Sequence, residues 1–121
     1  FVITQGFGTT PSGFTAKIWD NSGVNGAPGA TPLETKDVLG SRIDVTTGPD
    51  NAIVIFDSPV IINSGGFYIS YQAEFDGADI ALGIDQTGSL PLSNQNYEVL
   101  SGTFGEYRSN NSDDLMISVV M

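Results

Sequence analysis

Carboxylate and amide side chains gather in one glycine-rich loop, over residues 20–29, where they could hold a cation. The candidate ligands are Asp20, Asn21 and Asn25. Ca²⁺ takes about six to eight oxygen ligands, and tight sites usually supply several carboxylates. This loop has a single carboxylate. The alternative is a wide turn in which Asp and Asn cap the local backbone and Pro28-Gly29 forms the centre of a type II turn. The sequence leaves both interpretations open.

A second acidic group follows within residues 76–85. Asp76 and Asp79 could share an oxygen cage, and Asp85 would lie on the same strand face as Asp79. The alternative is a solvated hairpin with an Asp-Gly pair at its tip. Ca²⁺ is therefore the one cofactor that the sequence suggests, as a stabilising ion.

Catalytic chemistry has little support in the sequence. The chain has no His and no Cys, so it lacks the most common general base and the thiol nucleophile. A glycosidase needs two carboxyl groups held across a cleft, and none of the four glutamates stands in a distinctive motif. No Gly-x-Ser-x-Gly segment is present. We predict that the chain is not an enzyme, with a carboxylate-based hydrolase as the catalytic alternative.

Aromatic side chains offer a better basis for binding. If Phe14 faces the core, alternation along an extended strand places Trp19 on the opposite face, and Tyr68 is placed similarly on a second strand. Tyr97 and Tyr107 could join them in a flat platform for sugar rings. The alternative is that another part of the chain covers this face and the rings only pack there.

Short strands are the elements that would position these side chains. Apolar residues alternate with period two, and Gly, Pro and Asn clusters separate the runs. The strongest candidates are 14–19, 52–56, 67–72, 80–84 and 115–121, and the weaker ones are 1–5, 32–39, 42–46, 60–62 and 97–104. Residues 52–56 are apolar on both faces, which is typical of a central strand. We predict an all-β fold, an antiparallel, jelly-roll-like β-sandwich of about 8–10 short strands.

Length and charge narrow the range of partners. The 121 residues predict a single domain over 1–121. The net charge of −10 and the scattered basic residues disfavour nucleic acid, and no apolar run is long enough for membrane insertion. Residues 1–7 and 115–121 favour strands and carry no charge, so an open edge could pair with neighbouring modules or subunits. In that case the domain lacks a first strand that is supplied elsewhere.

Three segments resemble a family of β-sandwich modules found in large secreted bacterial proteins, often substrates of type IX secretion. They are FTAKIWDNSGVNGAPGATPLETKDV (14–38), FDSPVIINSGGFYISYQ (56–72) and GADIALGID (77–85). The chain departs from the family at Tyr97-Glu98 and Phe104, where the family usually has tryptophans. The resemblance implies a non-catalytic structural or adhesive module, extracellular or at the cell surface. The alternative is a carbohydrate-binding module that uses exposed Trp and Tyr.

Overall fold

The computed structural model describes most of the first half of the chain and shorter parts of the second half. The described residues are 1–6, 13–44, 48–63, 65–73, 80–82, 84–85, 97–100, 103–106, 114–115, 117 and 119. Strands dominate these residues, and the helical content is limited to two short 3₁₀ turns, Val24–Gly26 and Gly40–Arg42. The prediction of an all-β fold is confirmed.

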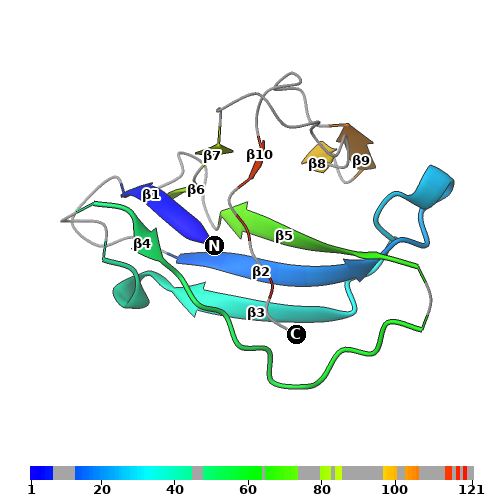
Figure 1. The fold of residues 1–121 in the computed structure, drawn as a ribbon, viewed down its shortest axis with the longest axis horizontal. Helices are drawn as coiled ribbons and strands as arrows, with labels where there is room; N and C mark the ends of the chain where they lie inside the picture. Colours follow the sequence, from blue (N-terminus) through cyan, green and yellow to red (C-terminus); the bar gives the residue numbers. More distant parts are fainter. Residues whose placement is uncertain are drawn as a thin grey trace.

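Ten strands are present in the described residues (Figure 1). Their bounds are β1 Val2–Gly6, β2 Gly13–Asp20, β3 Glu34–Leu39, β4 Asp50–Asn51, β5 Phe67–Ala73, β6 Ile80–Leu82, β7 Ile84–Asp85, β8 Tyr97–Leu100, β9 Thr103–Glu106 and β10 Asp114–Leu115. Every pairing among them is antiparallel. The predicted strands at 14–19 and 67–72 are confirmed as β2 and β5, whereas 60–62 is extended chain without strand pairing.

The largest sheet has the order β3-β2-β5, with β2 paired on both edges. Phe14 lies opposite Val38 on one side and Ala73 on the other, and Trp19 lies opposite Tyr68. Since successive side chains of a strand point to opposite faces, Phe14 and Ala16 share the inner face. Thr15, Lys17 and Trp19 share the outer face. The alternation read from the sequence therefore sets the two faces of the sheet.

Three smaller groups of strands complete the architecture. A second three-stranded sheet has the order β4-β1-β6, and β10 pairs with β7 and β8 with β9. In this second sheet β4 is an edge strand, since its only recorded strand partner among the described residues is β1. Residues 52–62 leave β4 and run past the β3-β2-β5 sheet (Figure 1).

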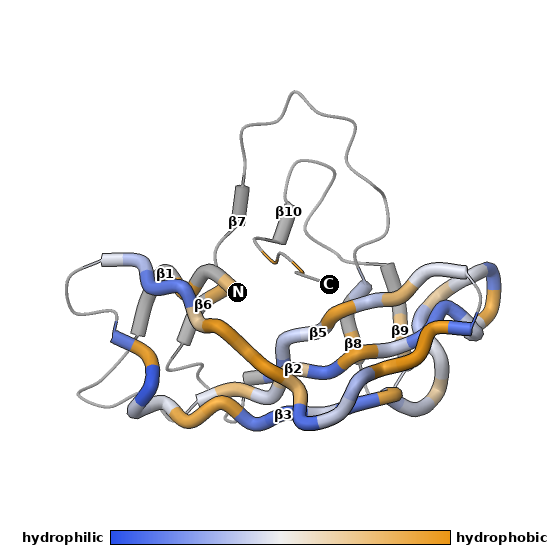
Figure 2. Tube along the Cα trace, turned by 60° about the horizontal axis from the view of Figure 1, so that its bottom comes forward, coloured by the Kyte–Doolittle hydropathy of each residue, from blue (hydrophilic) through white to orange (hydrophobic). Residues whose placement is uncertain are grey.

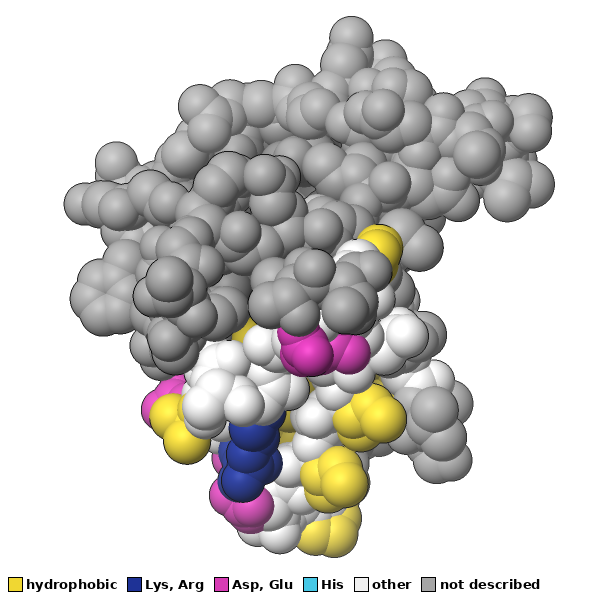
Figure 3. Space-filling view, turned by 90° about the vertical axis from the view of Figure 1, so that its left-hand side faces the viewer, with side chains coloured by type: hydrophobic (Ala, Val, Ile, Leu, Met, Phe, Trp, Pro, Cys, Tyr) yellow, Lys and Arg dark blue, Asp and Glu magenta, His cyan; other side chains and the backbone are white. Residues whose placement is uncertain are grey.

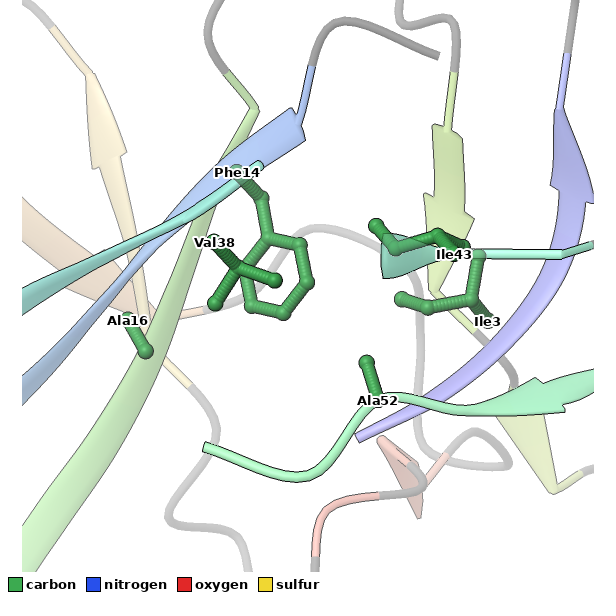
Figure 4. Close-up of a cluster of buried hydrophobic side chains, with 6 residues drawn as sticks. All are labelled: Ile3, Phe14, Ala16, Val38, Ile43 and Ala52. Atoms are coloured by element: carbon green, nitrogen blue, oxygen red, sulfur yellow. The ribbon is translucent and has the colours of Figure 1, made fainter. Parts of the chain in front are cut away.

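The core lies where the two three-stranded sheets approach each other. Figure 4 shows Phe14 and Val38 pointing toward Ile3, Ile43 and Ala52. Phe14 is fully buried, and its ring centroid lies 5.1 Å from that of Phe1. On its other side the ring of Tyr71 lies 5.0 Å away, at a tilt that favours aromatic pairing. Phe14 thus joins residues from four separate segments of the chain.

The segment 52–56 corrects one expectation. Its apolar residues on both faces predict a central strand, but only Ala52 has a backbone hydrogen bond within the described part of the chain, to Phe1. Burial alternates along the segment, with Ala52 buried and Ile53 exposed, then Val54 half-buried and Ile55 exposed. The chain is therefore extended, as predicted, but one of its apolar faces is open to solvent.

Replacing Phe14 by Ala removes the ring that connects these segments. We expect a loss of about 3–5 kcal/mol in the free energy of unfolding, because the cavity cannot close without moving both sheets. Urea unfolding followed by circular dichroism measures the loss. Leu39→Ala is the matched control on the same sheet, since that side chain is 61% exposed, and it should change stability by no more than about 0.5 kcal/mol. Equal losses in the two variants would contradict the proposed core.

Candidate functional site

Trp19 is buried, with only 9% of its surface exposed, so the expectation of an exposed tryptophan is wrong. It does lie on the outer face of the sheet, opposite to Phe14, as alternation predicts. The Phe104 ring of β9 packs against it edge-on, with the ring centroids 5.1 Å apart. Its indole Nε1 donates a hydrogen bond to Ser70 Oγ at 2.9 Å. The indole is therefore closed off by a ring contact and a satisfied donor.

Tyr68 and Tyr97 meet beside Trp19. Their rings are nearly perpendicular, with centroids 5.4 Å apart, and both side chains are half-buried. The hydroxyl of Tyr68 donates to the carbonyl oxygen of Gly26 at 2.6 Å, which ties β5 to the loop after β2. The pKa of Tyr68 is raised, first because burial disfavours the phenolate, and further by the charge and hydrogen bond of Tyr97. The fourth predicted platform residue, Tyr107, lies outside the described residues.

The structure thus brings Trp19, Tyr68 and Tyr97 together but arranges them for packing. A sugar platform needs ring faces open to solvent, whereas these rings meet edge to face. Lys17 lies 5.9 Å from the centroid of the Trp19 ring and donates to Gln72 at 2.6 Å. A cation at this distance stabilises an indole electrostatically. The part of the face that these residues form is a packed contact with a polar rim.

The loop at residues 20–29 is closed by its own hydrogen bonds. Oδ1 of Asp20 accepts from the Ser22 hydroxyl at 2.6 Å and from the Ser22 N–H at 3.2 Å. The Asp20 carbonyl oxygen accepts from Gly29 N–H at 3.0 Å. Asn25, with φ 57°, and Gly26, with φ 80°, take the left-handed conformation in the turn. A type II turn centred on Pro28-Gly29 is not formed, because Gly29 lacks the positive φ that such a turn needs, and a 3₁₀ turn lies at Val24–Gly26 instead.

Gly29 packs closely against two side chains of the loop. It is buried, and a Cβ there would collide with Oδ1 of Asp20 and lie 2.7 Å from Oγ of Ser22. Asn21 lies away from this contact, against Gly65, whose φ is 74°. Of the three predicted ligands in this loop, Asp20 is engaged with Ser22, Asn21 faces Gly65 and Asn25 is exposed.

The other predicted metal ligands, Asp76 and Asp79, lie outside the described residues. Within the residues that the structure describes, no group of three or more His, Cys, Asp and Glu side chains is close enough to hold a metal ion. The acidic residues of this part form local contacts instead. Asp57, for example, pairs with Lys36 at 2.6 Å, and Asp37 accepts from the Thr15 hydroxyl at 2.8 Å.

A large apolar concavity is the site that the sequence reasoning missed. It has a volume of about 790 Å³ and lies between residues 52–62 and the inner face of the sheet, at Ile18, Phe67 and Ile69. Its polar lining residues, Asn51 and Ser58, are uncharged. Figure 2 shows that the segment 52–62 is hydrophobic over most of its length. The apolar run on both faces of this segment is the signal in the sequence, but the same pattern also predicts a central strand.

No known protein suggests a function for this chain, so its function is inferred from the geometry described above. No family model, curated protein or solved structure matches this chain. The described segments also contain no helix with the length and apolar character needed to cross a membrane.

Removing the Ser70 hydroxyl tests how Trp19 is held. We expect Ser70→Ala to lower the free energy of unfolding by about 1–3 kcal/mol, since it leaves a buried indole N–H without its acceptor. The chain has one Trp, so its fluorescence reports on this position alone. Thr35→Ala, at an exposed position of the same sheet, is the control and should leave stability and emission unchanged. An identical response of the two variants would mean that Trp19 does not depend on Ser70.

The raised pKa of Tyr68 predicts a loss of stability at high pH. A tyrosine whose folded pKa lies above its unfolded value near 10 stabilises the fold at lower pH. That contribution is lost as the pH rises through the folded pKa, because the phenolate is poorly solvated and cannot donate to Gly26. Tyr68→Phe should lower stability at pH 8 and flatten its decline above pH ~10. Urea unfolding across this range measures both effects, and an unchanged slope in the variant would contradict the assignment.

Proposed function

We propose that this chain is a jelly-roll-like β-sandwich domain, spanning residues 1–121, that serves as a non-catalytic structural or adhesive module. The antiparallel strands support the architecture. So does the core, which forms between the β3-β2-β5 sheet and residues packed against it from β1, from Ile43 and from the segment that follows β4. A sandwich is the arrangement in which two such apolar faces bury each other.

The single observation that carries the proposal is the chemistry of the apolar concavity. A catalytic site needs titratable or nucleophilic groups that converge on a cleft. The lining of this concavity has no charged side chain. Such a surface can pack against another apolar surface, and the side chains that line it include no titratable group.

The alternative functions have weaker support. Among the platform residues that the structure describes, carbohydrate binding would have to rest on Tyr68 and Tyr97, since Trp19 is closed off by Phe104 and Ser70. Stabilisation by Ca²⁺ in the loop at residues 20–29 would have to use Asp20, whose carboxylate already accepts two hydrogen bonds from Ser22. A location outside the cell or at its surface is part of the proposal, on the sequence resemblance and the acidic composition, which favours solubility.

The experiment that tests this function separates packing from ligand binding at Trp19. A structural role predicts that Trp19→Ala lowers the melting temperature by roughly 10 °C or more, because a buried ring is lost. It also predicts that neither the unmodified protein nor the Trp19→Ala variant is retained on insoluble polysaccharides. A chelator should leave the melting temperature of the unmodified protein unchanged. Retention of the unmodified protein that disappears in Trp19→Ala at constant melting temperature would overturn the proposal in favour of glycan binding.

A further inference from the structure

The chain following β4 presents an unpaired strand edge. Both the N–H and the carbonyl oxygen of Ala52 point toward Phe1, at 2.9 and 3.4 Å. In an extended chain the backbone groups of successive residues point in opposite directions. Those of Ile53 and Ile55 therefore point away from β1, and within the described part of the chain no backbone group bonds to them. This outer edge continues the free edge of β4.

The side chains along this edge are apolar and exposed. Ile53 is 83% exposed and Ile55 is 77% exposed. Figure 3 shows hydrophobic side chains spaced along one side of the lower part of the molecule. Exposed sheet edges are usually protected by charged residues, by Pro or by a covering segment. Residues 52–56 contain no charge and no Pro, so this edge is open to pairing.

We propose that a second copy of this chain pairs with this edge, antiparallel, about a two-fold axis at Val54. This inference rests on the proposed structural role, and it identifies a second copy of the chain as the partner of the module. In this register Ile53 of each copy lies opposite Ile55 of the other, and these residues exchange the backbone hydrogen bonds that the free edge offers. Val54 then faces Val54 of the second copy, as a pair without backbone hydrogen bonds between them.

The charges and polarities along the segment select this register. With Val54 at the centre, Ala52 lies opposite Phe56, so every position of the apolar run meets an apolar residue. The chain bends at Asp57 and Ser58, so the two copies pair over residues 52–56 and the flanking acids stay outside the paired run. No like charges face each other across the pair, which is the arrangement that stabilises cross-strand neighbours.

The neighbouring registers are less favourable for a definite reason. Centring the pair on Ile55 would place Asp57 opposite Ile53, and centring it on Ile53 would place Asp50 opposite Phe56. Each shift puts a carboxylate against an apolar side chain, which removes water from that charge. Centring on Asp57 would bring two carboxylates face to face. The register centred on Val54 therefore pairs the apolar run without placing a carboxylate opposite an apolar side chain or another carboxylate.

Net charge gives the pairing an ionic-strength dependence of known sign. Each copy carries a net charge of −10, so two copies repel at long range. The apolar strand itself adds no charge, and Asp57 next to it is paired with Lys36. Added salt screens the repulsion, so the dimer should become stronger as the salt concentration rises from low to moderate.

Sedimentation at several protein concentrations measures the association. We expect a monomer–dimer equilibrium, and Ile53→Lys or Ile55→Lys should raise the dissociation constant about tenfold or more, since each change affects two symmetric pairs. A lysine lowers the net negative charge, so weaker association cannot come from added repulsion. Val24→Lys is the matched control, because Val24 is also an exposed aliphatic residue, at 84%, and lies in the loop after β2. It should leave the dimer intact.

A single cysteine tests the register in a chain that has none of its own. A pair without backbone hydrogen bonds has Cα atoms about 4.5 Å apart, within the range of roughly 4.4–6.8 Å that a disulfide spans. Val54→Cys should therefore form a disulfide-linked dimer under mild oxidation, whereas Ile55→Cys and Val24→Cys should not. Preferential linkage through Ile55→Cys would overturn the register.

The remaining outcomes are equally decisive. A monomer at all concentrations and salt levels, or a dimer that both lysine variants leave unchanged, overturns the proposal. A monomer that captures an apolar strand peptide at this edge also overturns it, in favour of a different partner. None of these results affects the structural role itself, which is tested separately through Trp19.

Discussion

The pairing of β2 on both edges is the constraint on which the rest of this structure depends. Its register with β3 and β5 is set over most of its length, and side chains of a strand alternate strictly between faces. Once Phe14 is placed in the core, Trp19 must lie on the outer face. A slip of one residue would exchange the two sets and place Lys17 in the apolar core. The fold therefore has one acceptable register for this strand.

The same constraint explains why both faces of the sheet are covered. The inner face packs against Ile3, Ile43 and Ala52, and the outer face carries an indole that is covered by Phe104. An indole buries a large apolar area but retains one N–H that needs an acceptor. Ser70, the outward-facing residue of β5 beside Tyr68, supplies that acceptor. Packing and hydrogen bonding are thus satisfied together by neighbouring positions of two strands.

The sequence predicted the strands that have strong alternation, because alternation reports directly on burial. It placed β2 and β5 correctly. It could not predict whether the outer face would be covered, because that depends on a hairpin eighty or so residues away, at Tyr97–Glu106. The same limit applies to residues 52–56, since an apolar run identifies two faces that favour burial but does not identify what buries them.

The acidic residues at the ends of the apolar run 52–56 limit the registers in which this exposed edge can pair. A long uncharged edge could pair in many registers and build open stacks of strands. Here Asp50 and Asp57 limit the apolar run to the five residues between Asn51 and Asp57, and Pro59 removes a donor just beyond. Each slipped register meets a carboxylate on an apolar partner or on another carboxylate. Because a two-fold pair uses the same edge of both copies, it leaves no free copy of that edge, and association stops at two. The charges that make this chain strongly acidic are thus placed where they convert an exposed edge into a closed contact.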